Sequence, residues 1–142
     1  MNSATTKFLD GYNCAQSVLF AHCEELGLDE DLALKMACGF GGGLGRLQEI
    51  CGAASGAVLV LGLRHGRGSN DAPTATETTY AKTREFLTRF KAACGGLTCR
   101  ELLKGCDLLT PEGHQGFKDN DLRRKVCVPC VERAVEILKE MK

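Results

Sequence analysis

The longest stretch of the chain without a charged residue is residues 51–63, CGAASGAVLVLGL, whose apolar side chains would cover every side of a helix. A helix that is apolar all round is usually buried. This one is too short to cross a bilayer, which needs about 20 apolar residues. The pattern therefore predicts the buried central helix of a protein that is not embedded in a membrane.

Amphipathic segments on both sides of this stretch predict the helices that cover it. Their apolar residues recur at helical spacing, and N-capping Ser, Asn, Asp or Thr residues precede them. The expected helices cover residues 4–10, 14–26, 30–38 and 75–93, a short segment from Cys99, and a last segment from about 127 to 141. No segment alternates as a strand would. We expect an all-α fold, in which residues 1–142 form a single domain of about six helices around the central one.

The same periodicity predicts which side chains of the outer helices face the core. In the helix over 30–38 the inward face includes Leu32 and Met36, and in the helix over 75–93 it includes Tyr80. We expect these large apolar side chains to be buried.

Residues 39–45, GFGGGLG, contain five glycines and do not read as ordinary helix. A dinucleotide-binding fingerprint needs glycines at i, i+2 and i+5 after a strand, and a P-loop needs Gly-Lys-Ser/Thr. Neither pattern occurs here. The segment is therefore interpreted as a loop whose backbone packs tightly against another part of the chain.

The charge balance and the N-terminal residues indicate which partners and which cellular location to expect. Eighteen basic and eighteen acidic residues give a formal net charge of zero, so no nucleic-acid partner is expected. The first residues form neither a basic nor an apolar leader, which predicts a cytoplasmic location. Nine cysteines are many for a cytoplasmic chain and indicate metal, cluster or redox chemistry more than disulfides.

Four of the cysteines lie at predicted helix starts. Backbone N–H groups and the helix dipole lower a thiol pKa at such positions. If the four helix ends converge, they form a thiolate-rich site suited to a soft metal, an iron–sulfur cluster or dithiol exchange. These cysteines are Cys14, Cys51, Cys99 and Cys127.

The remaining cysteines leave two alternatives open. Cys127-Val128-Pro129-Cys130 has the local form of a thioredoxin-type dithiol, although the βαβ context of that motif is absent. A zinc site could combine Cys127 and Cys130 with a second pair, at spacings looser than usual for zinc. That second pair would be Cys94 and Cys99, or Cys99 and Cys106. Cys23 and Cys38 are interpreted as packing residues.

Five segments together resemble a family of redox-active proteins named for a C…CGAxxG…C…C signature, and the resemblance covers nearly the whole chain. It implies redox activity carried by the four cysteines. It also implies a link to a transporter, because relatives are often encoded near transporter genes. A similar domain fused to a di-haem cytochrome implies an iron–sulfur centre. The segments are 11–16 (GYNCAQ), 39–43 (GFGGG), 51–56 (CGAASG), 99–103 (CRELL) and the stretch from Cys127 that continues with Val131 and Ala134.

These observations predict a cytoplasmic redox-active protein, an electron carrier or an oxidoreductase, that serves a redox partner of unknown identity. Cys14, Cys51, Cys99 and Cys127 are expected to bind a [2Fe–2S] cluster as cofactor and metal ligands. One alternative is a thiol–disulfide protein without a cofactor. Another is a zinc-stapled binding module associated with a transporter. A homodimer would also cover the apolar central helix.

Overall fold

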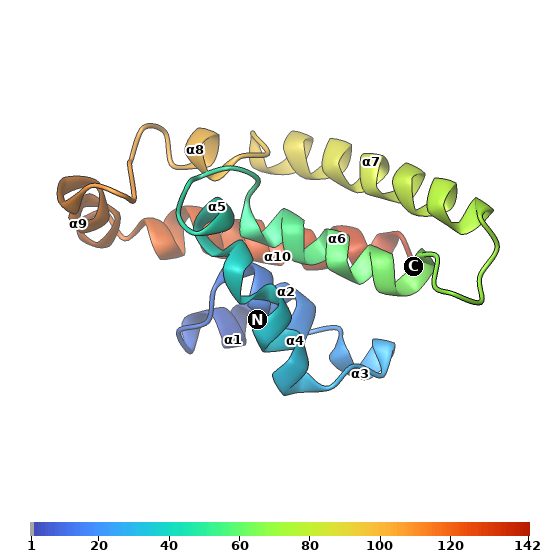
Figure 1. Ribbon diagram of the computed structural model, residues 1–142. Coiled ribbons are helices and arrows are strands. Elements are labelled where there is room, and N and C mark those ends of the chain that lie inside the picture. The colour runs from blue at the N-terminus through green and yellow to red at the C-terminus, as the bar shows by residue number, and fades with distance from the viewer. Residues whose placement is uncertain (1) are drawn as a thin grey trace.

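The predicted central helix, α6 (Gly52–His65), lies at the centre of the computed structural model, which describes residues 2–142 (Figure 1). It packs against α2, α7 and α10. Helices are the only regular elements of the described residues, which confirms the all-α prediction. They are α1 (Ser3–Leu9), α2 (Cys14–Phe20), α3 (Cys23–Leu26), α4 (Glu30–Ala37), the 3₁₀-helix η1 (Cys38–Phe40), α5 (Gly41–Leu44), α6, α7 (Thr74–Cys94), α8 (Cys99–Leu102), α9 (Pro111–Asp119), the π-helix η2 (Arg123–Cys127) and α10 (Val128–Glu140).

Small residues let α2 and α6 approach closely. A Cβ atom on Gly56 would stand 2.7 Å from the carbonyl oxygen of Ala15 and 3.2 Å from the Cβ of Val18. One turn earlier, a Cβ on Gly52 would stand 3.2 Å from the Cβ of Cys14. The close crossing therefore brings the start of α2 beside the start of α6, where Cys14 and Cys51 lie.

Adding a methyl group at this crossing should destabilise the fold. Gly56→Ala is expected to cost about 1–3 kcal/mol, because the backbone of α2 must move to admit the new Cβ. Gly62→Ala, in the same helix, is the matched control, since a Cβ there meets nothing within 4 Å. It should gain about 0.5–1 kcal/mol from helix propensity. Urea unfolding of both variants measures the difference, and equal effects would contradict the close crossing.

The helix expected over residues 14–26 is interrupted at His22, so that α2 and α3 are separate. The buried His22 ring places Nδ1 2.8 Å from the carbonyl oxygen of Val18, which an α-helix would pair with the amide of His22. That amide instead donates to the carbonyl of Leu19. The His22 ring thus takes the place of the His22 amide at the carbonyl of Val18. The amide bonds one residue closer, at Leu19, and the α-helix ends there.

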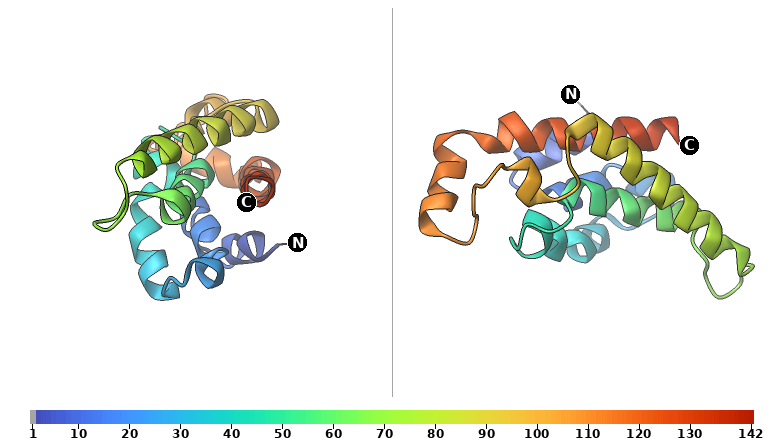
Figure 2. Two further views of the ribbon diagram at one scale, coloured as in Figure 1. Left: turned by 90° about the vertical axis from the view of Figure 1, so that its right-hand side faces the viewer. Right: turned by 90° about the horizontal axis from the view of Figure 1, so that it is seen from above.

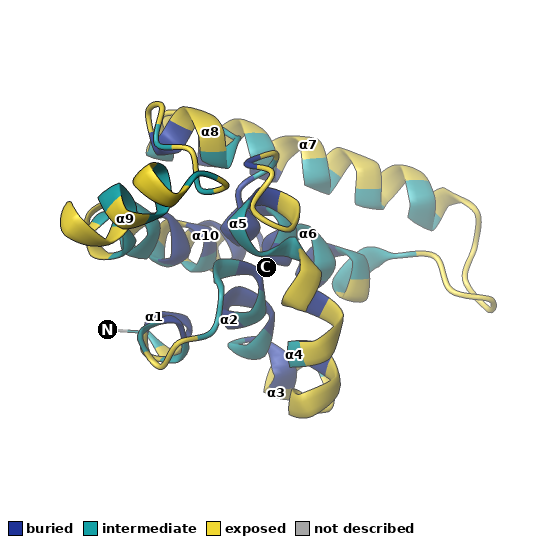
Figure 3. Cartoon of the chain, turned by 60° about the vertical axis from the view of Figure 1, so that its left-hand side comes forward, coloured by how far each residue is buried: buried dark blue, intermediate teal, exposed yellow. Residues whose placement is uncertain are grey.

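Three large side chains predicted to face the core are exposed instead. Leu32 and Met36 of α4 are 49% and 44% exposed, and its buried positions are Ala33 and Ala37. Tyr80 of α7 is 56% exposed. The helical period identifies the apolar face of a helix, but it does not tell over what length neighbouring helices cover that face. The buried residues of α7, Phe86 and Phe90, lie in its C-terminal half, while its first half extends beyond the other helices (Figures 2 and 3).

One ion pair ties together the ends of three helices. Arg64 of α6 donates to both carboxylate oxygens of Glu25 in α3, at 2.7 and 3.1 Å, and to the carbonyl oxygen of Leu138 in α10 at 2.9 Å. The hydrogen bond from Arg64 lowers the pKa of Glu25. Beside this pair, burial lowers the pKa of His22 below its ordinary value of 6.5.

These shifts predict that the fold is less stable in acid. A lowered folded-state pKa contributes stability that is complete above the unfolded pKa and is lost as the pH falls through the folded one. Stability should therefore begin to fall below about pH 6.5 through His22, and fall further below about pH 4.5 through Glu25. Urea unfolding between pH 7 and 5 should show a shallower loss in His22→Gln than in the wild type. An unchanged pH dependence in that variant would contradict the assignment.

No helix within residues 2–142 combines the length and the apolar character that crossing a membrane requires.

Candidate cysteine site

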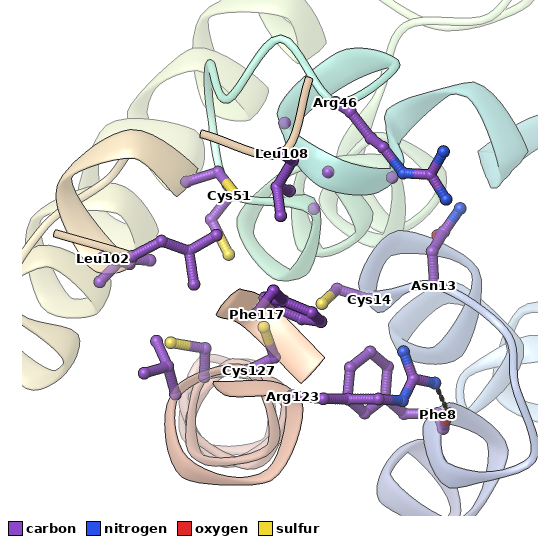
Figure 4. A pocket seen from close by; sticks show the side chains of 18 of the residues that line it. Phe8, Asn13, Cys14, Arg46, Cys51, Leu102, Leu108, Phe117, Arg123 and Cys127 are labelled. Atoms are coloured by element: carbon purple, nitrogen blue, oxygen red, sulfur yellow. Dashed lines mark hydrogen bonds between the residues drawn. The ribbon is translucent and has the colours of Figure 1, made fainter. Parts of the chain in front are cut away.

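The four cysteines at predicted helix starts converge on one cavity of about 370 Å³. Figure 4 labels three of them, Cys14, Cys51 and Cys127. Cys14 comes from α2, Cys51 precedes α6, Cys99 begins α8 and Cys127 ends η2. All nine cysteines of the chain are free thiols. The structure thus brings the four together, and their role as ligands stays a prediction.

Cys14 is positioned by the N-cap that the sequence indicated. The Asn13 side chain accepts a hydrogen bond from the amide of Gln16 at 2.9 Å, and the Gln16 side chain accepts one from the amide of Asn13 at 3.0 Å. Asn13 Nδ2 also donates to the carbonyl oxygen of Cys38 at 2.8 Å. The capping box therefore fixes the start of α2 and attaches it to the segment that enters the glycine loop.

Cys51 and Cys99 are brought together by a short antiparallel pairing outside the helices. Ile50 and Thr98 form an isolated β-bridge. The amide of Cys51 donates to Leu97 at 2.8 Å, and the amide of Cys99 donates to Glu49 at 2.7 Å. Backbone hydrogen bonds thus hold the two cysteine-bearing segments side by side.

Cys127 immediately precedes α10, as predicted, but the helix start there is not free, because η2 runs directly into it. Its backbone is helical, with φ −70° and ψ −43°, and the chain is already helical from Arg123. Pro129 has no N–H group for an ordinary helical bond to residue 125, and a wider π-turn precedes it. The helix therefore runs through Cys127 and leaves no row of free N–H groups there.

The thiol pKa of Cys51 is lowered, whereas the pKa values of Cys14 and Cys99 are raised. A hydrogen bond from Cys130, with smaller contributions from the amides of Ala53 and Ala54, outweighs burial at Cys51. The pKa of Cys14 is raised by its hydrogen bond with Cys127, by burial and by the neighbouring thiols. Burial, followed by the nearby cysteines, raises the pKa of Cys99 to about 12. The predicted lowering at each helix start fails at Cys14 and Cys99, because desolvation and adjacent sulfurs outweigh the helix dipole.

Two further cysteines, Cys130 and Cys38, line this cavity. Cys130 lines the same cavity, and the pKa of its thiol is raised by Cys51 and Cys94. Cys38, interpreted from sequence as a packing residue, is exposed and also lines the cavity. Cys23 does pack as expected, since it is buried and its Sγ lies 3.6 Å from the carbonyl oxygen of Leu19. The three-residue spacing from Cys127 to Cys130 was the available signal for Cys130, because it places both thiols on one side of a helix.

The glycine loop forms one wall of the cavity, through Gly41, Gly42, Gly43 and Gly45. A Cβ on Gly43 would stand 2.6 Å from the amide nitrogen of Glu49 and 2.7 Å from the Cα of Gln48. The buried Gln48 side chain in turn donates to the carbonyl oxygen of Cys106 at 2.7 Å and accepts from the amide of Leu108 at 3.0 Å. The tight packing expected of the loop is therefore present, and it anchors Leu108 at the cavity.

Positive charge also borders the cavity. Arg123 donates to the carbonyl oxygens of Phe8 and Tyr12, and its guanidinium lies 3.9 Å from the centre of the Phe8 ring. Arg46 lies on the glycine-loop side (Figure 4). Both cations therefore lie in the wall of the cavity that the thiols also line.

The sulfurs are spread around the cavity and do not meet at one point. Within residues 2–142, no three His, Cys, Asp or Glu side chains are grouped closely enough to hold one metal ion.

Comparison with known proteins places this cysteine arrangement in a family. Residues 12–141 match the family described as "Putative redox-active protein (C_GCAxxG_C_C)". The chain belongs to this family. The family label places glycine before cysteine, GCAxxG, whereas this member has Cys51 before Gly52 in CGAASG.

A curated relative adds no further activity. An "Uncharacterized protein" from Archaeoglobus fulgidus is 31% identical over 133 residues, which cover 88% of this chain and 81% of that protein. No solved structure matches the chain.

Proposed function

We propose that Cys14, Cys51, Cys99 and Cys127 bind a [2Fe–2S] cluster and that the protein transfers single electrons to or from a redox partner. The observation that carries this proposal is the convergence of four thiols, from four separate segments, on one cavity. Thiolates are the usual ligands of iron–sulfur clusters, and four of them complete the ligation of a [2Fe–2S] centre. The cluster would supply one-electron chemistry.

The chemistry of the donor set fits such a group. Thiols are soft metal donors, and the cavity gathers four of them from separate segments of the chain. The raised pKa values of Cys14 and Cys99 keep these thiols protonated when no metal is bound to them. Metal binding deprotonates a coordinating thiol, so loading would release protons and become weaker in acid.

The rest of the cavity would shield the site from water. Leu102 and Leu103 are buried beside Cys99, and Leu108 and Phe117 complete the apolar lining. An apolar shell limits solvent access and thereby tunes the redox potential of a metal centre. Arg123 would offset part of the negative charge of four thiolates.

Reduction of the purified protein tests this function. Dithionite should bleach the visible absorption reversibly and produce a paramagnetic signal from one unpaired electron per cluster. The expected effect is full recovery of the absorption on reoxidation. Absorption that does not respond to reduction, in protein that contains iron and sulfide, would contradict electron transfer at this site.

Cys127 raises the pKa of Cys14 more than any other neighbour and lines the same cavity, which favours a second candidate function, thiol–disulfide exchange. In that case, mild oxidation of cluster-free protein would join Cys14 to Cys127 with loss of two thiols. Peptide mapping under non-reducing conditions would identify this bond. The link to a transporter and the existence of a redox partner stay predictions.

A further inference from the structure

Cys130 lies between two cavities. On one side it lines the four-cysteine cavity described above. On the other it lines an open hollow of about 480 Å³ that it shares with Cys94, at the junction of the C-terminus of α7 with α8 and α10. Neither Cys14, Cys51, Cys99 nor Cys127 lines this hollow.

Cys94 and Cys130 are the two cysteines that line the hollow. The Cys130 thiol is the largest influence on the pKa of Cys94, which it lowers, so the two thiols are neighbours. Cys94 is half-buried at the last residue of α7, whereas Cys130 is 4% exposed. An accessible thiol beside a buried one in the same hollow is the arrangement of an attacking and a resolving cysteine.

The hollow is lined by more positive than negative side chains. Lys104, Lys125 and Arg133 border it, with Glu101 as the one carboxylate among its lining residues. The Glu101 carboxylate accepts hydrogen bonds from the amides of Leu97 and Thr98, and Arg133 also pairs with Glu136 at 3.1 Å. The charge favours an anionic ligand beside Cys94. The hydrogen bond from Cys130, with Arg133 nearby, also lowers the pKa of Cys94.

We infer that Cys94 and Cys130 form a second thiol–disulfide site, distinct from the four predicted cluster ligands, which reduces a low-molecular-weight disulfide bearing carboxylate groups. This site does not depend on the cluster.

The exchange balances in two steps. The Cys94 thiolate attacks one sulfur of the disulfide, forms a mixed disulfide and releases the first thiolate, which takes up the proton lost by Cys94. Cys130 then attacks the Cys94 sulfur and releases the second thiolate, which takes up the proton of Cys130. One external disulfide is thus reduced to two thiols while Cys94 and Cys130 become joined, and a single turnover needs no other reactant.

The charge of the disulfide is the variable to test. Full-length reduced protein is mixed separately with 3,3′-dithiodipropionate, bis(2-hydroxyethyl) disulfide and cystamine, which are anionic, neutral and cationic. Acid quenching, alkylation and peptide mapping then give the rate at each cysteine. The exposed Cys38 is the internal control for the intrinsic reactivity of each reagent.

The ratio of the Cys94 rate to the Cys38 rate should be about tenfold higher for the anionic disulfide than for the cationic one, because the hollow attracts negative charge. The product should contain a Cys94–Cys130 disulfide. In Lys125→Ala/Arg133→Ala the preference for the anionic reagent should shrink. In Cys130→Ser a mixed disulfide should accumulate on Cys94.

A ratio independent of reagent charge would overturn the inference, as would a Cys51–Cys130 bond in place of the Cys94–Cys130 bond. Cys94→Ser should lose the exchange and keep the iron content of the wild type. Exchange at Cys94 in a protein that binds no iron would support this site while rejecting the proposed cluster, so the two proposals fail separately.

Discussion

Replacing Cys51 with serine should abolish the cluster while leaving the fold intact. A serine hydroxyl is a poor substitute for a thiolate ligand of iron, so iron, sulfide and visible absorption should all fall to near zero. Serine is a favoured N-cap, and Cys51 occupies the N-cap position of α6, so the helix should be retained. Metal and sulfide analysis, together with far-ultraviolet circular dichroism of the variant, measures both expectations.

Cys23→Ser is the matched control for this variant. Cys23 is also buried, but it does not line the cavity. Its replacement should leave the iron and sulfide content at the wild-type level. Intact absorption in Cys51→Ser, or equal losses in both variants, would contradict the assignment of Cys51 as a ligand.

Gly43→Ala should cause the second large effect, a loss of both stability and cluster. Gly43 has φ +71°, and an added Cβ would be 2.6–2.8 Å from the backbone of Gln48 and Glu49. Left-handed strain and the clash together should cost about 2–4 kcal/mol. Because residues 48–50 directly precede Cys51, their displacement should also move Cys51 and lower the iron content. Urea unfolding and iron analysis of the same sample measure the two effects.

Gly45→Ala separates the clash from the backbone strain. Gly45 also has a positive φ, +57°, but an added Cβ meets nothing within 4 Å. It should cost only about 1–2 kcal/mol. It should also keep the iron content of the wild type. A cost as large as that of Gly43→Ala would show that the close packing of the loop against residues 48 and 49 is unimportant.

Much of the local structure could be predicted because its signals lie within a few residues of one another. Of three capping boxes that the sequence predicts, those of Asn13 with Gln16 and of Thr98 with Glu101 form. The third, Thr74 with Glu77, is wrong, because α7 already begins at Thr74 and has no side-chain cap. The uninterrupted apolar run of α6 correctly identified the central helix. These features depend on local hydrogen bonds and on burial of a whole helix, so the sequence alone is enough to predict them.

The geometry of the site depends on contacts between distant segments. The pairing of Ile50 with Thr98 consists of an isolated bridge, which has no repeating pattern to detect. The sequence grouped Cys94 with Cys130 only in the zinc alternative, because their proximity joins the end of α7 to the start of α10 in three dimensions. The pKa rise at Cys14 and Cys99 likewise comes from burial and from neighbouring thiols, which the local helix starts do not reveal.

The most direct test of the central claim uses protein purified without oxygen. Its visible spectrum is recorded, and iron, acid-labile sulfide and zinc are counted on the same sample, before and after cluster reconstitution. The account predicts sulfur-to-iron charge-transfer bands with two iron and two sulfide per chain. A colourless protein that stays free of iron after reconstitution, or one that contains zinc alone, would contradict it.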